Sequence, residues 1–176
     1  MKRINALSFQ AKLLLILILP LSGVLGLGVV GVTEKISFLR QMDQVNHLSH
    51  LAVQIGTLIH EIQKERGLTA GFLGSAGNKF RMELSRQRVA TKGSFAALTT
   101  SSAMAEAKGI GSELQNFLQM ALESYGQSDA LRDQVDRLAL TAEEAIAHYS
   151  GVNAKLLNTI GYLSSISPTV EMATLF

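Results

Sequence analysis

Apolar residues recur at steps of three and four through two long stretches of the chain, and this period limits the fold more than any other feature. It is the period of an α-helix with one buried face. Two prolines and no tryptophan also favour helices over a sheet. We therefore predict an all-α chain that folds as an antiparallel four-helix bundle. The first stretch contains Leu48, Leu51, Ala52, Ile55, Leu58, Ile59 and Ile62, and the second contains Leu131, Val135, Leu138, Ala142, Ala145, Tyr149, Val152, Leu156, Ile160 and Leu163.

Residues 13–32 form an apolar run of twenty residues without a charge. A helix rises about 1.5 Å per residue, so this run is long enough to cross a hydrocarbon core of about 30 Å. No small-residue cleavage site of the Ala-x-Ala type follows it, which favours an uncleaved anchor over a signal peptide. The sequence therefore predicts a transmembrane helix that continues into the bundle.

The orientation of this span follows from the basic residues beside it. Lys2, Arg3 and Lys12 precede the run, whereas Glu34 and Lys35 follow it and offset each other. The positive-inside rule then places the N-terminus in the cytoplasm. In a bacterial cell we expect a single-pass protein of the inner membrane.

Three regions follow from this orientation. They are a cytoplasmic tail over residues 1–12, the span over 13–32 and a periplasmic helical region over 33–176.

The remaining composition excludes several classes of protein. The net charge is +2, but without Lys2, Arg3 and Lys12 the chain has 13 basic against 14 acidic residues, so a nucleic-acid partner has no electrostatic support. The absence of cysteine excludes disulfides and thiolate metal sites. No HExxH motif, phosphate-binding loop or nucleophile elbow occurs. We therefore predict no enzyme activity, no cofactor and no metal site.

A charge pair, Glu65-Arg66, follows the first apolar stripe where leucine or isoleucine would be expected. An inward-facing guanidinium is costly unless it is paired with Glu65, with another carboxylate, or with an anion bound between helices. Gly67 and Gly71 lack bulk, so another backbone can approach this surface closely. The alternative is a solvated arginine followed by a glycine-rich helix end.

The next helix is expected to begin at an N-cap on Asn78 and to carry Gln87 and Arg88 inside its apolar arc. This helix carries a basic cluster made of Lys79, Arg81, Arg86, Arg88 and Lys92. We single out Arg88 because it lies in the apolar arc, whereas Arg86 points elsewhere. A short helix from Ser112 is expected next, with Gln115 completing a capping box.

The last helix is predicted to be unbroken from Leu131 to Leu163, so the capping-box match of Thr141 with Glu144 inside it is interpreted as chance. Arg132 lies next to the apolar stripe. Asp136 follows it by four residues and offers a simple intrahelical pair.

These features resemble the NIT domain, the nitrate- and nitrite-sensing module of bacterial transmembrane receptors such as chemoreceptors. The resemblance covers roughly Gln44 to Phe176. The residues that carry it are the segment QKERGLTAGFL between Leu58 and Gly74, the pair Gln87-Arg88, and Leu131-Arg132-x-x-Val135-Asp136 with Tyr149 and Asn153-x-x-Leu156-Leu157.

The resemblance implies an all-helical sensor that binds nitrate or nitrite through Arg66, Arg88 and Arg132 and passes a conformational change to an output domain. It also implies structural support from Glu65, Gly67, Gly71 and Gln87. The family's domain continues with a second helical half, and in receptors an output domain follows. We therefore expect this chain to be a C-terminally truncated product or a fragment.

Two other classes stay open. The small surface around Gly67 and Gly71, together with the last helix's stripe, predicts a homodimer, so the chain is alternatively a membrane-anchored helical dimerisation module. It is alternatively a four-helix sensor of another small ligand, because a fold does not determine its ligand. Arginine favours nitrate, since its planar paired donors match the edge of a planar monoanion.

Overall fold

The computed structural model describes residues 9–167, and every regular element in that range is an α-helix. This confirms the prediction of an all-α chain. The contacts divide the chain into two compact units, Met1–Asp43 and Gln44–Phe176. The helices are α1 (Phe9–Gly74), α2 (Arg81–Thr99), α3 (Ser102–Ala107), α4 (Ser112–Gly126), α5 (Ser128–Asp136) and α6 (Ala142–Ile166).

The first unit contains the N-terminal part of α1. Several of its leucines are strongly exposed, among them Leu17, Leu21 and Leu25. Within the part of the chain that the structure describes, none of the helices combines the length and the apolar character that crossing a bilayer requires. The transmembrane span predicted over residues 13–32 is therefore not confirmed.

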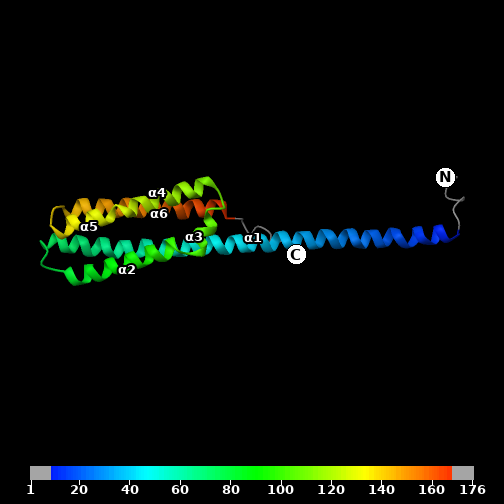
Figure 1. Ribbon diagram of the computed structural model, residues 1–176, viewed down its shortest axis with the longest axis horizontal. Coiled ribbons are helices and arrows are strands. Elements are labelled where there is room, and N and C mark those ends of the chain that lie inside the picture. The colour runs from blue at the N-terminus through cyan, green and yellow to red at the C-terminus, as the bar shows by residue number, and fades with distance from the viewer. Residues whose placement is uncertain (1–8, 168–176) are drawn as a thin grey trace. The chain divides into compact units, whose positions relative to one another are not determined.

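The second unit is a helical bundle (Figure 1). The C-terminal part of α1 lies beside α2, and α4 followed by α5 packs along α6. One large apolar cluster fills the space between these helices, and it contains the first predicted stripe and much of the α6 part of the second. Its fully buried members include Leu51, Ile55, Leu58, Ile62, Leu98, Leu114, Tyr149, Val152 and Leu156.

The turn between α1 and α2 differs from the expected one. Asn78 does not cap α2, because its side-chain Nδ2 donates to the carbonyl oxygen of Ser75 at 2.9 Å. Helix α2 begins at Arg81, and its N-cap residue Phe80 has a positive φ of 65°. Phe80 lies over Gly71, where an added Cβ would come within 2.8 Å of its ring. The small size of Gly71 therefore serves a contact within the chain.

The region before α4 contains a helix that the sequence did not predict. Ser101 caps α3 by accepting a hydrogen bond from the Met104 N–H at 3.1 Å. The capping box predicted at Ser112 is wrong, because the N-cap of α4 is Gly111 and makes no side-chain cap. The Gln115 side chain instead donates to a carbonyl of the preceding turn, that of Lys108.

The second apolar stripe does not belong to one unbroken helix. Helix α5 ends at Asp136, Leu138 takes a positive φ of 53°, and α6 begins at Ala142. The capping box of Thr141 with Glu144 is formed: the Thr141 Oγ1 accepts from the Glu144 N–H at 3.2 Å, and Glu144 Oε2 accepts from the Thr141 N–H at 2.8 Å. Val135 of α5 and Ala145 of α6 are buried in one apolar cluster, so the apolar period is present on both sides of the turn, whereas Leu138 in the turn is exposed.

Candidate anion-binding site

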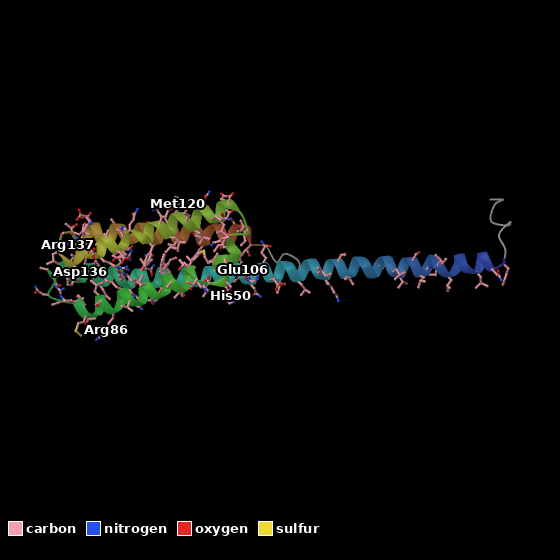
Figure 2. The ribbon with its side chains drawn as sticks, in the orientation of Figure 1. His50, Arg86, Glu106, Met120, Asp136 and Arg137 are labelled. Atoms are coloured by element: carbon pink, nitrogen blue, oxygen red, sulfur yellow. The ribbon has the colours of Figure 1, made fainter. Side chains whose placement is uncertain are left out.

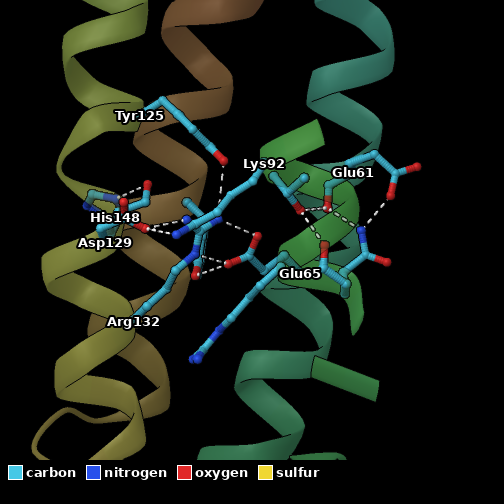
Figure 3. Close-up of polar contacts among 12 residues, drawn as sticks. Glu61, Glu65, Lys92, Tyr125, Asp129, Arg132 and His148 are labelled. Atoms are coloured by element: carbon cyan, nitrogen blue, oxygen red, sulfur yellow. Dashed lines mark hydrogen bonds and ion pairs between the residues drawn. The ribbon is translucent and has the colours of Figure 1, made fainter. Parts of the chain in front are cut away.

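A buried ion pair joins α1 to α5 at the centre of the second unit (Figure 3). Glu65 has an exposed fraction of 0% and Arg132 one of 4%. The Arg132 guanidinium donates two parallel hydrogen bonds to the Glu65 carboxylate, from Nε to Oε1 at 2.7 Å and from Nη2 to Oε2 at 2.8 Å. The Tyr149 hydroxyl of α6 donates to the same Oε1 at 2.9 Å. Three helices therefore meet at one carboxylate.

The other side of the Arg132 guanidinium is also occupied. Its Nη1 donates to Oδ1 of Asp129 at 2.8 Å, and its Nη2 donates to the Tyr125 hydroxyl at 3.3 Å. The Lys92 Nζ of α2 lies 2.9 Å from the same Asp129 oxygen. These hydrogen bonds from Lys92 and Arg132 hold the pKa of Asp129 below its usual value.

The ionisation of the buried groups follows from their partners. Burial opposes the charge of Arg132, but its hydrogen bonds to Glu65 and Tyr125 outweigh burial and raise the pKa of Arg132 further above its ordinary value. Burial raises the pKa of Tyr149, and the Glu65 carboxylate adds to that effect. The centre of the bundle therefore holds a charged arginine, which is hydrogen-bonded to the Glu65 carboxyl group, and a neutral tyrosine.

Arg66 does not pair with its neighbour Glu65, because Glu65 is already held by Arg132. The half-buried side chain of Arg66 instead reaches α6, where its Nη1 donates to the Ser150 Oγ at 3.0 Å. Among the described residues, no carboxylate lies within ion-pair distance of Arg66. Its positive charge is therefore not balanced by this part of the chain.

Arg88 pairs across helices rather than standing free. Its Nη1 donates to both carboxylate oxygens of Asp136, at 2.9 and 2.8 Å. The intrahelical pair predicted between Arg132 and Asp136 is therefore wrong. Within the described part of the chain, the Nε and Nη2 atoms of Arg88 are buried and have no hydrogen-bond partner.

A pocket of about 340 Å³ lies between α2 and α5. Arg88 and Arg132, which were predicted from separate segments, both line it, whereas Arg66 does not. Arg86, another arginine of the basic cluster, is exposed on α2 (Figure 2). The charged groups that line the pocket are Arg88, Lys92, Asp129, Arg132, Asp133 and Asp136.

Gln87 fixes α2 against α1. Its side-chain Nε2 donates to the Glu61 carbonyl at 3.2 Å and also to the Glu61 carboxylate. This second hydrogen bond lowers the pKa of Glu61. Gln87 therefore positions the helix that carries its neighbour Arg88.

The sequence did not identify the partners that occupy these arginines. The helical period predicted Tyr149 as a core residue and the resemblance included it, but neither gave its hydroxyl a partner. Asp129 precedes Arg132 by three residues, which is a pairing distance on a helix and the one local signal that pointed to this contact.

The family model for nitrate and nitrite sensing matches residues 57–175. The chain therefore belongs to the NIT family of nitrate- and nitrite-sensing domains. Among solved structures it is similar to the NasR transcription antiterminator, with 28% sequence identity and a TM-score of 0.68. The match covers 72% of this chain and 34% of that chain, so the chain spans about a third of the NasR structure. No curated protein sequence matches it.

Proposed function

We propose that this chain binds nitrate or nitrite as the ligand-binding part of a signalling protein. We also propose that Arg66 is the main residue that binds the anion. Membership of the NIT family supports the ligand class. The observation that carries the choice of residue is the unbalanced charge of Arg66. Arg88 and Arg132 stay predicted ligands, but carboxylates already hold both of their guanidinium groups.

The surroundings of Arg66 suit a small planar anion. One of the five N–H donors of Arg66 bonds to Ser150, and the other four have no hydrogen-bond partner among the described residues. The Ser150 hydroxyl accepts that bond and still has its own proton to donate to an anion. An added Cβ at Gly67 would meet no described atom within 4 Å, so the surface next to Arg66 is open. A guanidinium and a hydroxyl together offer charge and directed donors to a weakly hydrated monoanion.

Binding at Arg66 would act on the contact between α1 and α6. Glu65 and Tyr149 hold the two helices together one residue away, so the backbone beneath Arg66 is fixed. An anion that binds the remaining Arg66 donors and accepts from the Ser150 hydroxyl would bridge α1 and α6. We therefore propose that anion binding changes the α1–α6 contact, and that this change transmits the signal to an output domain.

Titration calorimetry of the purified chain with nitrate, nitrite and chloride tests this function. Replacing Arg66 with Ala removes the charge and the paired donors, so nitrate affinity should fall roughly a hundredfold. Arg66→Lys restores the charge without the fork and should recover little. Arg86→Ala is the matched control, because Arg86 is exposed on α2 and its replacement removes the same charge as Arg66→Ala. Equal weakening by Arg66→Ala and Arg86→Ala would show a diffuse surface effect and reject the Arg66 site.

The membrane anchor is a separate part of the proposal. Its support is the uncharged run over residues 13–32 and the exposure of Leu17, Leu21 and Leu25 on the first unit. Alkaline phosphatase fused after residue 176 should be active, because the basic residues before the run favour a cytoplasmic N-terminus. Fluorescence from a cytoplasm-only reporter at that position would reverse the orientation, and recovery of the chain in the soluble fraction would reject the anchor.

A further inference from the structure

We infer that the pocket between α2 and α5 is a second anion site, and that the Asp129 carboxylate is an internal ligand which a small monoanion such as nitrate displaces. This site is separate from Arg66 and rests on different contacts.

The geometry around Asp129 is that of a bound oxyanion. A single oxygen, Oδ1, lies 2.9 Å from the Lys92 Nζ and accepts a hydrogen bond from the Arg132 Nη1 at 2.8 Å. The lysine comes from α2 and the arginine from α5, so two cationic donors from two helices converge on one point (Figure 3). Short charge-assisted hydrogen bonds of this kind do not distinguish a carboxylate oxygen from an oxygen of nitrate.

The exposure of the three side chains shows which of them can move. The Asp129 side chain is 67% exposed and that of Lys92 is 56% exposed, whereas that of Arg132 is 5% exposed. Glu65 holds Arg132 in place through Nε and Nη2 and leaves Nη1 directed at Asp129. A side-chain rotation therefore releases the Asp129 carboxylate to water while the Arg132 donor stays in position.

Arg88 supplies a second reason for an anion in this pocket. Asp136 takes up its Nη1, but its Nε and Nη2 are buried without a partner in the described part of the chain. A buried donor without an acceptor is costly. An entering anion that accepts a hydrogen bond from Nε or Nη2 of Arg88 removes that cost. The Asp129 carboxylate accepts from neither nitrogen in this structure.

The charges of the pocket favour a monoanion. With Asp129 turned to solvent, Arg132 stays balanced by Glu65 and Arg88 by Asp136, which leaves Lys92 for the ligand. Asp133 also lines the pocket, and among the described residues it forms no ion pair. Its charge repels a divalent anion more strongly than a monovalent one, so nitrate should be preferred over sulfate.

Replacement of the Asp129 carboxylate by an anion would change the contact between α2 and α5. Lys92 and Asp129 form an ion pair between α2 and α5, and a second pair, Arg88 with Asp136, lies on the same two helices. Displacement of Asp129 breaks the first of these and leaves the second. Occupancy of the pocket is therefore coupled to how tightly α2 is held against α5.

The test removes the internal ligand in a chain that already carries Arg66→Ala, so that only this pocket is measured. Asp129→Ala should raise nitrate affinity by about tenfold or more over Arg66→Ala alone, because the competing carboxylate is gone. Asp133→Ala is the matched control: it removes the same charge from the same pocket but no contact to Lys92 or Arg132. Lys92→Ala added to Asp129→Ala should reverse the gain. Sulfate should bind the Asp129→Ala variant more weakly than nitrate.

Each outcome decides between the alternatives. Equal gains from Asp129→Ala and Asp133→Ala would mean that net charge alone acts, and no gain from Asp129→Ala would reject the internal ligand. Asp129→Asn keeps the shape of the side chain and should give a smaller gain in the same direction, so it serves if the Ala variant loses its helical circular dichroism. The Arg66 proposal fails independently, when Arg66→Ala alone binds nitrate as tightly as the unaltered chain.

Discussion

The Tyr149 hydroxyl donates to Glu65 Oε1 at 2.9 Å, and the next residue on each helix repeats the contact, Arg66 to Ser150 at 3.0 Å. Two successive residues of α1 thus meet two successive residues of α6. The first pair is buried and the second is half-buried. A fixed polar contact in the core therefore lies directly beside Arg66, whose charge no carboxylate of the described residues balances.

The buried carboxylate should make Arg132 more important for stability than any other arginine in the bundle. Replacing Arg132 with Met leaves the fully buried Glu65 with Tyr149 as its one remaining side-chain partner among the described residues, so we expect a loss of about 3 to 5 kcal/mol in the free energy of unfolding. Glu65→Gln should cost less, because Arg132 keeps its bond to the exposed Asp129. Urea unfolding followed by circular dichroism measures both.

Lys64→Met is the control for this series. Lys64 pairs with Glu61 at 3.1 Å, but the lysine side chain is 48% exposed. Such exposed pairs contribute about 0 to 1 kcal/mol. A loss for Arg132→Met as small as that for Lys64→Met would show that the central pair does not hold the bundle together.

Tyr149 should make the chain sensitive to alkali. Its pKa in the folded protein is raised, mainly by burial, above the value of about 10 that an unfolded tyrosine has. The folded state then retains a proton that the unfolded state loses, so the contribution is intact below about pH 10 and is lost as the pH rises above it. Unfolding free energies at a series of pH values should fall more steeply above pH 10 in the unaltered chain than in Tyr149→Phe. Parallel curves would contradict this assignment.

Much of the architecture could be predicted from the helical period, and the breaks in it could not. The helical period predicted the bundle part of α1 and the helices on both sides of the turn, because burying one face of a helix requires apolar residues at that period. It continues from Val135 through Leu138 to Ala142 although the backbone turns there. The positive φ of Leu138 marks that turn, and nothing in the apolar pattern distinguishes such a residue from one inside a helix.

The pairing of the arginines in the candidate site could not be predicted from the sequence. The resemblance to the NIT domain selected Arg66, Arg88 and Arg132, and the structure places Arg88 and Arg132 in one pocket. Local spacing suggested Arg132 with Asp136, whereas Arg132 pairs with Glu65, which is 67 residues away. Contacts between helices depend on the register of one helix against another, and a single sequence does not specify that register.

The capping residues give a direct test of the turn before α6. Thr141→Ala removes the side-chain cap that satisfies the Glu144 N–H and should cost about 1 kcal/mol of unfolding free energy. Ser112→Ala should cost almost nothing, because Ser112 makes no cap at the start of α4 even though its sequence match is similar. Thermal unfolding of the two variants checks the order, and a larger loss from Ser112→Ala would contradict both cap assignments.

Gly71 and Gly67 separate a contact within the chain from a contact between chains. An added Cβ at Gly71 would lie 2.8 Å from the Phe80 ring, so Gly71→Ala should overpack the turn and cost about 1 to 3 kcal/mol of unfolding free energy. An added Cβ at Gly67 would meet no described atom within 4 Å, and Gly67 is exposed, so Gly67→Ala should leave the monomer as stable or slightly more stable, since alanine favours a helix.

Of the two glycines, Gly67 is then the one on which the predicted homodimer depends. Sedimentation of Gly67→Leu should shift toward monomer if that surface joins two copies, while Gly71→Ala should lower the melting temperature without changing the mass. An unchanged mass distribution for Gly67→Leu, in a chain that sediments as a dimer, would place the dimer contact elsewhere on the bundle.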